Sequence, residues 1–138
     1  MIRLIVVIGV AGAAAGLGVL SRRRRDAPTQ SVNASPTQLD RADFVHPSTP
    51  WLVVVFTSAT CNTCADIEIK ARVLESELVA VHISEFSAQR DLHKRYNIEA
   101  VPALLLADSV GVVHQSFLGP VTATDLWASL ARARDQTP

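Results

Sequence analysis

The chain contains two cysteines, Cys61 and Cys64, which stand three positions apart. Two thiols at this spacing can form a disulfide or exchange with a disulfide in another molecule. The attacking group in such an exchange is a thiolate. The start of a helix favours a thiolate because unpaired N–H groups and the positive end of the helix dipole stabilise the negative charge. Cys61 is therefore the predicted nucleophile, and Cys64, one helical turn further on, is the predicted resolving thiol.

Two other uses of this pair stay open. As a structural bridge, the disulfide would close a loop of about four residues and contribute roughly 2 kcal/mol to stability, which is little for a domain with its own core. As a metal site, the two thiolates would bind a soft ion such as copper or zinc, but the histidines show no pair at zinc-finger spacing. We predict no metal ligands and expect all four histidines at surface or half-buried positions: His46, His82, His93 and His114.

The segments around the cysteines predict one α/β domain. Residues 51–56 form an uninterrupted apolar run, which is typical of a central strand covered on both faces. Residues 65–78 place four apolar side chains, from Ile67 to Leu78, on one face of a helix. Further strands are predicted over 78–83, 103–107 and 112–118, and further helices over 89–96 and 122–133. The order βαβαββα predicts a mixed central sheet flanked by helices, with an antiparallel edge.

Finer expectations concern the two later helices. In the helix over 89–96, Leu92 and Tyr96 are predicted to face inward. At the start of the last helix, Thr122 is predicted to be the N-cap and to face Asp125, three residues on. Three apolar side chains of that helix are predicted to be buried: Leu126, Trp127 and Leu130.

With its elements in this order, the chain from about residue 39 to residue 133 resembles the thioredoxin family. Residues 56–64, Phe-Thr-Ser-Ala-Thr-Cys-Asn-Thr-Cys, follow a buried strand, and residues 96–102, Tyr-Asn-Ile-Glu-Ala-Val-Pro, precede another strand. The predicted hairpin and Gly119 before the last helix complete the likeness. The resemblance implies a thioredoxin-like fold and a protein-disulfide oxidoreductase without a cofactor, whose partners are protein disulfide or dithiol substrates and a second redox protein that recharges it.

The same resemblance assigns roles to residues near the cysteines. Pro102 is expected to be cis and to lie beside the active-site sulfurs, and Val101 is expected to offer its backbone to an extended substrate. The supporting residues would be Thr60, Asn62 and Thr63, since a threonine hydroxyl can donate a hydrogen bond to a thiolate. A soft-metal chaperone with this fold and a non-catalytic interaction domain stay open as alternatives.

Five positions depart from thioredoxins proper. Thioredoxins carry Trp at the position of Thr60, Gly-Pro between the cysteines, a buried aspartate at the position of Val55, and a basic residue at that of Ala65. The aspartate is thought to help deprotonate the resolving thiol, so Cys64 must lose its proton by another route. Nearby carboxylates, at Asp66 among others, oppose thiolate formation. The pattern therefore leaves reductase, oxidase and isomerase activity all open.

The amino-terminal segment predicts a membrane anchor. Residues 4–20 are uncharged and apolar, and a helix of this length spans roughly 25 Å. Adding residue 2 and letting the flanking arginines reach the headgroups brings the span close to a ~30 Å hydrocarbon core. We therefore predict a transmembrane helix over 2–21, a basic stop-transfer segment and flexible linker over 22–38, and the domain over 39–135. The block Arg22–Arg25 argues against a cleaved signal peptide.

Charge distribution predicts orientation and excludes one class of partner. The positive-inside rule places Arg22–Arg25, and hence the domain, on the cytoplasmic side, with an extracytoplasmic domain as the alternative. From residue 37 onward there are eight Lys or Arg residues and twelve Asp or Glu residues, a net charge of −4. An acidic domain does not offer the basic face that nucleic acids require. The predicted protein is a bacterial-type, single-pass, membrane-anchored thioredoxin-domain protein.

Overall fold

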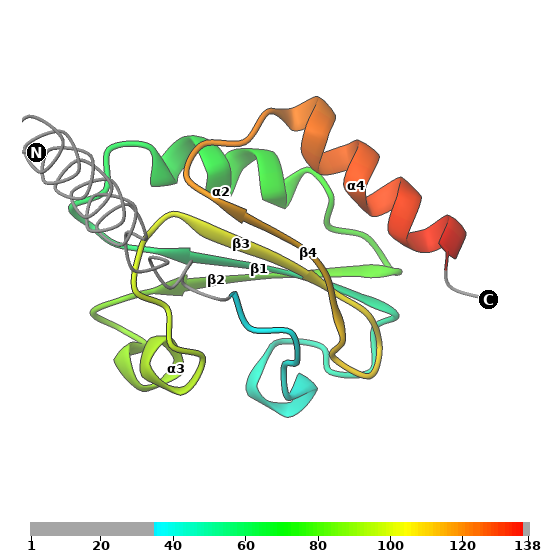
Figure 1. Ribbon diagram of the computed structural model, residues 1–138, viewed down its shortest axis with the longest axis horizontal. Helices are drawn as coiled ribbons and strands as arrows, with labels where there is room; N and C mark the ends of the chain where they lie inside the picture. The colour runs from blue at the N-terminus through cyan, green and yellow to red at the C-terminus, as the bar shows by residue number, and fades with distance from the viewer. Residues whose placement is uncertain (1–34, 137–138) are drawn as a thin grey trace, which may run out of the picture. The chain divides into compact units, whose positions relative to one another are not determined.

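A computed structural model describes residues 35–136 of the chain (Figure 1). The predicted anchor over 2–21 and most of the predicted linker over 22–38 lie outside the described residues. No helix between residues 35 and 136 is long and apolar enough to cross a membrane. The elements follow one another as η1 (Arg41–Asp43), β1 (Trp51–Thr57), α2 (Cys64–Arg72), β2 (Val79–Glu85), α3 (Arg90–Arg95), β3 (Ala103–Ala107), β4 (Val113–Leu118) and α4 (Ala123–Gln136).

The four strands form one mixed sheet in the order β2-β1-β3-β4. β1 pairs with β2 in parallel and with β3 antiparallel, and β4 pairs antiparallel with β3 at the edge. This arrangement confirms the predicted element order and the antiparallel edge. Every residue of β1 is buried, as expected for a central strand with layers on both faces.

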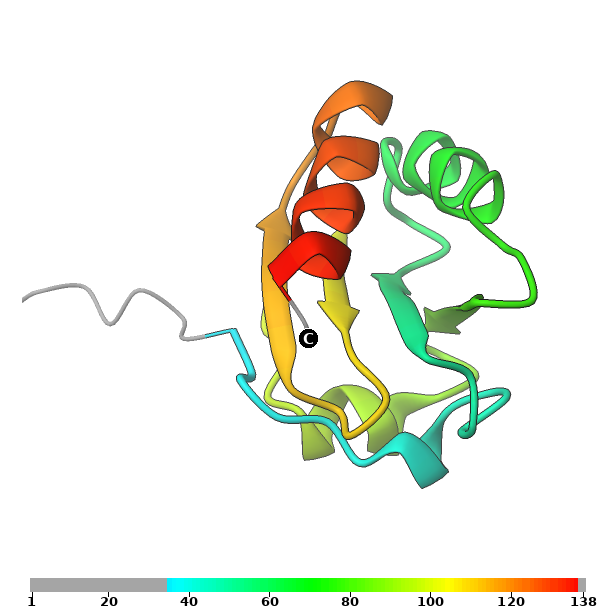
Figure 2. The same ribbon diagram turned by 90° about the vertical axis from the view of Figure 1, so that its right-hand side faces the viewer.

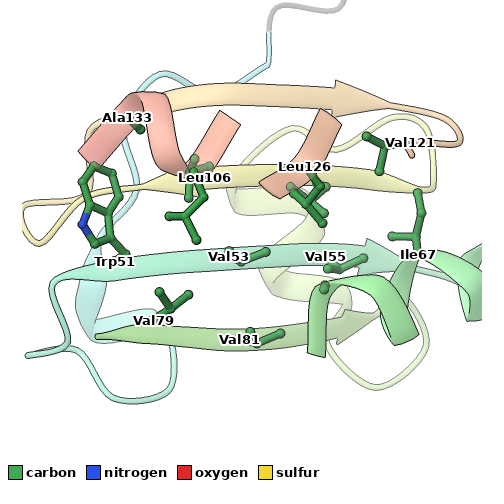
Figure 3. Close-up of a cluster of buried hydrophobic side chains, with 13 residues drawn as sticks. Trp51, Val53, Val55, Ile67, Val79, Val81, Leu106, Val121, Leu126 and Ala133 are labelled. Carbon is green, nitrogen blue, oxygen red and sulfur yellow. The ribbon is translucent and has the colours of Figure 1, made fainter. Parts of the chain in front are cut away.

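The two faces of the sheet carry different helices. α2 and α4 cover one face, whereas α3 and η1 lie on the other (Figure 1). Successive side chains of β1 point to opposite faces of the sheet. Val53 and Val55 join the cluster with Ile67 and Leu126, as Figure 3 shows. The β1 residues that alternate with them join the cluster on the other face. That second cluster includes Leu39, Phe44, Leu52, Val54, Phe56, Tyr96 and Leu105.

The short helix η1 was not predicted. Asp40 caps it by accepting a hydrogen bond from the backbone N–H of Ala42 at 3.0 Å. The buried Arg41 guanidinium donates to the carbonyl oxygens of Thr49, Asp108 and His46, and its burial lowers the pKa of this side chain. Arg41 therefore ties the segment before β1 to the turn that connects β3 and β4.

The predicted helix over 65–78 is too long, because α2 ends at Arg72. The carbonyl of Leu78 accepts a hydrogen bond from the N–H of Trp51 at 3.0 Å, so the backbone at this residue belongs to the start of the sheet. Val79 takes the inward position and pairs with Trp51. Leu78 therefore points outward, with 48% of its surface exposed, and the prediction that it shares one helical face with Ile67 is wrong.

The last helix confirms one expectation and corrects another. The Thr122 hydroxyl accepts a hydrogen bond from the Asp125 N–H at 3.1 Å and donates to its carboxylate at 2.7 Å, which is the predicted N-terminal cap. Trp127, however, is 47% exposed. The buried stripe of α4 runs through Leu126 and Leu130, and Trp127 stands about 100° away from Leu126 around the helix.

Candidate functional site

The loop between β1 and α2 places both cysteines at the carboxyl end of β1. Backbone hydrogen bonds shape this loop: the Cys61 N–H donates to the Ser58 carbonyl at 3.0 Å, and the Cys64 N–H donates to the Cys61 carbonyl at 3.4 Å. Cys64 is the first residue of α2. In Figure 2, β1 points towards the end of the sheet at which α2 and α4 begin.

Cys61 and Cys64 are joined by a disulfide, with Cα atoms 5.5 Å apart. Cys61 is partly exposed, whereas only 2% of the Cys64 surface is exposed. The difference follows from the helix, because Cys64 shares a face with Ile67 and Ala71, which pack on the sheet. A partner molecule can therefore reach the sulfur of Cys61, while the sulfur of Cys64 is reached through Cys61.

Val101 and Pro102 lie at the same end of the sheet. Phe56, near the end of β1, pairs with Ala103, so the two residues before Ala103 stand beside the start of the cysteine loop. The Val101–Pro102 peptide bond is cis, as the resemblance implied. Pro102 is buried, and its carbonyl accepts a hydrogen bond from the Gly119 N–H at 2.8 Å, whereas Val101 keeps part of its surface exposed.

The three supporting residues named from the sequence differ in where their side chains point. The Thr63 hydroxyl lies 3.8 Å from the sulfur of Cys61. The Thr60 hydroxyl lies 3.1 Å from that of Ser58, so it holds the loop. Asn62 is exposed. Among these three, Thr63 therefore has a side chain within reach of the Cys61 sulfur.

Glu85 is part of the site and was missed in the sequence. It ends β2, and its carboxylate accepts hydrogen bonds from the N–H groups of Ala59 at 3.2 Å and Ala88 at 2.9 Å. Backbone hydrogen bonds from Ser87 and Ala88 are the main cause that lowers the pKa of Glu85. Because Ala59 belongs to the cysteine loop, Glu85 links that loop to the turn before α3. A single acidic residue at a strand end gives no sequence signal for such a link.

Two buried histidines correct the expectation that all four histidines lie at surface or half-buried positions: His82 is 8% exposed and His93 is 2% exposed. His93 lies near the end of β1. Its ring meets the edge or face of Phe56 and Phe86 at centroid distances of 5.0 and 5.3 Å, and its Nε2 lies 2.9 Å from the Ser84 carbonyl. Since a carbonyl only accepts, Nε2 carries the proton. The ring supports the carboxyl end of β1 from the α3 face.

The negative charge of Asp66, which opposes thiolate formation, is partly compensated by a neighbouring lysine. Asp66, in the first turn of α2, forms an ion pair with Lys70 one turn later. The Lys70 ammonium also donates to the Val121 carbonyl at 3.0 Å, which anchors it near the start of α4. A cation beside an exposed carboxylate reduces the field that this carboxylate exerts on the cysteines.

Two buried residues of β1 lie shortly before the cysteine loop. Val55, at the position where thioredoxins carry an aspartate, is fully buried in the cluster that contains Ile67. Thr57, two residues on, is 1% exposed, and within residues 35–136 its hydroxyl has no hydrogen-bond partner. In the same part of the chain, no group of three or more His, Cys, Asp or Glu side chains is placed to hold a metal ion.

The whole arrangement can be compared with known structures. A thioredoxin from Halobacterium salinarum, carrying a substitution at one asparagine, superposes with a TM-score of 0.61 over 76% of this chain and 98% of that chain, at 19% identity. The domain has a thioredoxin-like fold. The germline-specific thioredoxin Deadhead from Drosophila melanogaster gives a TM-score of 0.54 over 62% of this chain and 83% of that chain, also at 19% identity.

A third similar structure is thioredoxin-2 of the malaria parasite, described as a component of its protein secretion machinery. It gives a TM-score of 0.53 at 13% identity, over 60% of this chain and 82% of that chain. No protein-family profile and no curated protein sequence matches the chain. At these identities the likeness concerns the fold, and the disulfide at the start of α2 is what relates this fold to redox chemistry.

Proposed function

We propose that the chain is a thiol–disulfide oxidoreductase that exchanges disulfides with protein substrates through Cys61 and Cys64. The observation that carries the proposal is the unequal exposure of the two bonded cysteines at the start of a helix: Cys61 is partly exposed and Cys64 is buried. Exchange requires one sulfur that a substrate can reach and a second that is held close to the first. A disulfide serving only as a structural bridge has no need of this asymmetry.

In the reducing direction, the Cys61 thiolate attacks one sulfur of a substrate disulfide. A mixed disulfide forms between Cys61 and that sulfur, and the other substrate sulfur leaves as a thiolate and takes up a proton. Cys64 then loses its proton and attacks the Cys61 sulfur. This second step re-forms the Cys61–Cys64 bond and releases the remaining substrate thiol. The substrate gains two electrons and the protein loses two, and the same steps in reverse oxidise a substrate dithiol.

The surroundings of Cys61 favour its thiolate. The first N–H groups of α2 are unpaired within the helix, and their dipoles attract a negative charge. The Thr63 hydroxyl, 3.8 Å from the Cys61 sulfur, is placed to donate to that charge. Val101 and Pro102, beside the loop, complete the proposed docking surface: the partly exposed Val101 would pair its backbone with an extended substrate chain.

The test uses the full-length chain in mild detergent and insulin as a disulfide substrate, with dithiothreitol as electron donor. The wild type is expected to accelerate insulin reduction, and Cys61→Ser is expected to abolish the acceleration. Reduced Cys64→Ser, freed of dithiothreitol and then mixed with insulin, is expected to accumulate a mixed disulfide on Cys61, visible as a band that added reductant removes. The double variant is the matched control and should trap nothing. The proposal fails if neither single variant changes the rate or traps a partner.

Membrane attachment belongs to the same proposal and rests on the sequence. Residues 2–21 would span the bilayer, and Arg22–Arg25 would hold the domain on the cytoplasmic side. The tether would restrict exchange to partners at that membrane surface. Carbonate extraction should leave the full chain in the membrane fraction, and a cytoplasm-dependent reporter fused after the domain should be active. Release by carbonate contradicts the anchor, and an inactive reporter in the membrane fraction reverses the orientation.

A further inference from the structure

Thr57 presents a buried hydroxyl without a partner at the site. Its side chain is 1% exposed, and its Oγ1 has no hydrogen-bond partner within residues 35–136 while Cys61 and Cys64 are bonded to each other. An unpaired hydroxyl in the interior has a free-energy cost of about 1–3 kcal/mol. Such a group has a physical reason to be present if it acquires a partner in another state of the protein.

The direction of this hydroxyl follows from the strand. Val53 and Val55 point to the face covered by α2 and α4, and the β1–β2 ladder continues in register to Thr57. Because side chains alternate, Thr57 points to that same face. The hydroxyl therefore lies under the beginning of α2 and not under α3.

The level of Thr57 along the sheet matches that of Cys64. Val55 and Ile67 belong to one packed cluster, and α2 runs back along β1 because the parallel strand β2 follows it. From Val55 to Thr57 the strand advances about 7 Å towards its carboxyl end. From Ile67 back to Cys64 the helix retreats about 4.5 Å in the same direction. Both side chains are almost fully buried, so they share one enclosed region.

We propose that the Thr57 hydroxyl donates a hydrogen bond to the Cys64 sulfur when the disulfide is open, and so stabilises the resolving thiolate. The inference rests on the proposed exchange function and names a positioning residue within it. Thr57 neither takes nor gives up a proton: Cys64 loses its proton to water or to the departing substrate thiolate, and the hydroxyl lowers the pKa of Cys64. It acts where Val55 leaves no carboxylate to assist.

The test follows the two steps of exchange with a chromogenic aromatic disulfide, Ellman's reagent. Reduced full-length chain in detergent releases one thiolate when Cys61 attacks, and a second when Cys64 attacks the mixed disulfide. The pH dependence of the second step in wild type, Thr57→Val and Thr57→Ser reports the state of Cys64. The charged groups around this region stay the same in all three: Asp66, Glu68 and Lys70 of α2, Glu85 of β2 and Asp125 of α4.

Thr57→Val is expected to raise the pKa of Cys64 by about 1, which lowers its thiolate fraction about tenfold below the pKa. A more basic thiolate is also about threefold more nucleophilic. The second step should therefore be about threefold slower than wild type at low pH and about threefold faster at high pH, so that the two profiles cross. The first step should not change, and Thr57→Ser should follow the wild type.

A packing defect would not produce crossing profiles. Thr57→Val should also leave the oxidised protein at least as stable as the wild type, because it removes an unpaired hydroxyl and keeps the side-chain shape. Thr57→Ala serves as a second variant and should give the same crossing with lower stability. If the pH profiles of the second step superimpose for Thr57→Val and the wild type, the proposed role of Thr57 is overturned and the exchange function is not. A wild type without any second step would overturn the exchange function and this inference together.

Discussion

Opening the disulfide should change the stability of the domain only modestly. The bridge closes a loop between residues three apart, and restricting so short a loop in the unfolded chain contributes about 2 kcal/mol. Reduction also creates a thiolate at the start of α2, where the helix terminus stabilises it by about 0.3–1 kcal/mol and offsets part of the loss. The reduced protein should therefore be about 1–2 kcal/mol less stable than the oxidised protein.

Core packing is the reason that the reduced domain is expected to stay folded. The cluster under α2 and α4 includes Val53, Val55, Leu104, Leu106 and Leu126, each 0% exposed. Burying one such side chain fully contributes about 1.5–3 kcal/mol, so one short bridge is a minor part of the total. An enzyme that cycles between dithiol and disulfide needs this property, since both forms must keep the substrate surface intact.

Urea unfolding of the full-length chain in detergent, with and without dithiothreitol, measures this difference. With a urea slope of about 1 kcal/mol per molar, the midpoint should fall by about 1–2 M on reduction. The double variant Cys61→Ser/Cys64→Ser should unfold close to the reduced wild type and should not respond to reductant. A loss of about 4 kcal/mol or more, or loss of cooperative unfolding, would refute the reasoning and make the bridge a structural one.

Two further predictions concern residues away from the cysteines, each measured by urea unfolding. Gly111→Ala should lower the free energy of unfolding by at least about 3 kcal/mol, because φ is +85° and the new Cβ would lie 2.0 Å from the Leu39 carbonyl oxygen. Gly119→Ala, with φ +82° and open space around the new Cβ, should lower it by about 1 kcal/mol. Equal losses in the two variants would contradict the steric argument. Burial first, and then the hydrogen bond to Asp43, raise the pKa of Tyr96 to about 12. Its contribution to stability should be complete below pH 10 and lost as the pH rises from about 10 through 12. Tyr96→Phe should lack this loss and be about 1 kcal/mol less stable at neutral pH; a parallel pH dependence in both proteins would exclude Tyr96 as its source.

The sequence predicted best those features that depend on neighbours along the chain. The short apolar run that forms β1 is typical of a covered strand, and the Thr122 cap needs only Asp125 three residues away. The cis bond before Pro102 was available from the family resemblance, since a proline before a strand would not by itself imply it. For these features, the residues nearby in the sequence or the family resemblance were enough to predict the structure.

The predictions were wrong where contacts with residues distant in the sequence determine the local structure or the burial of a side chain. Leu78 has the spacing of the apolar helix face, but α2 has ended at Arg72. Leu78 lies in the turn before β2, where its carbonyl accepts a hydrogen bond from the Trp51 N–H. Trp127 is apolar and next to Leu126, yet the sheet contacts only the stripe centred on Leu126. His93 lies on a charged helix, and the rings of Phe56 and Phe86, which lie outside that helix, pack against its ring.

The same distinction explains why the cysteines were visible in the sequence and their surroundings were not. A pair of thiols three apart is a local signal. The groups that act on the cysteine pair belong to other elements. Glu85 of β2 contacts the cysteine loop through the Ala59 N–H, and Thr57 is the buried last residue of β1, beneath α2. Where thioredoxins place one buried carboxylate, this chain has an apolar residue and, two positions on, an unpaired hydroxyl. A hydroxyl stabilises a thiolate by donating to it but cannot accept its proton, so the proton of Cys64 must leave along a separate route. The pH at which the second step of exchange becomes fast is then set by Cys64 itself.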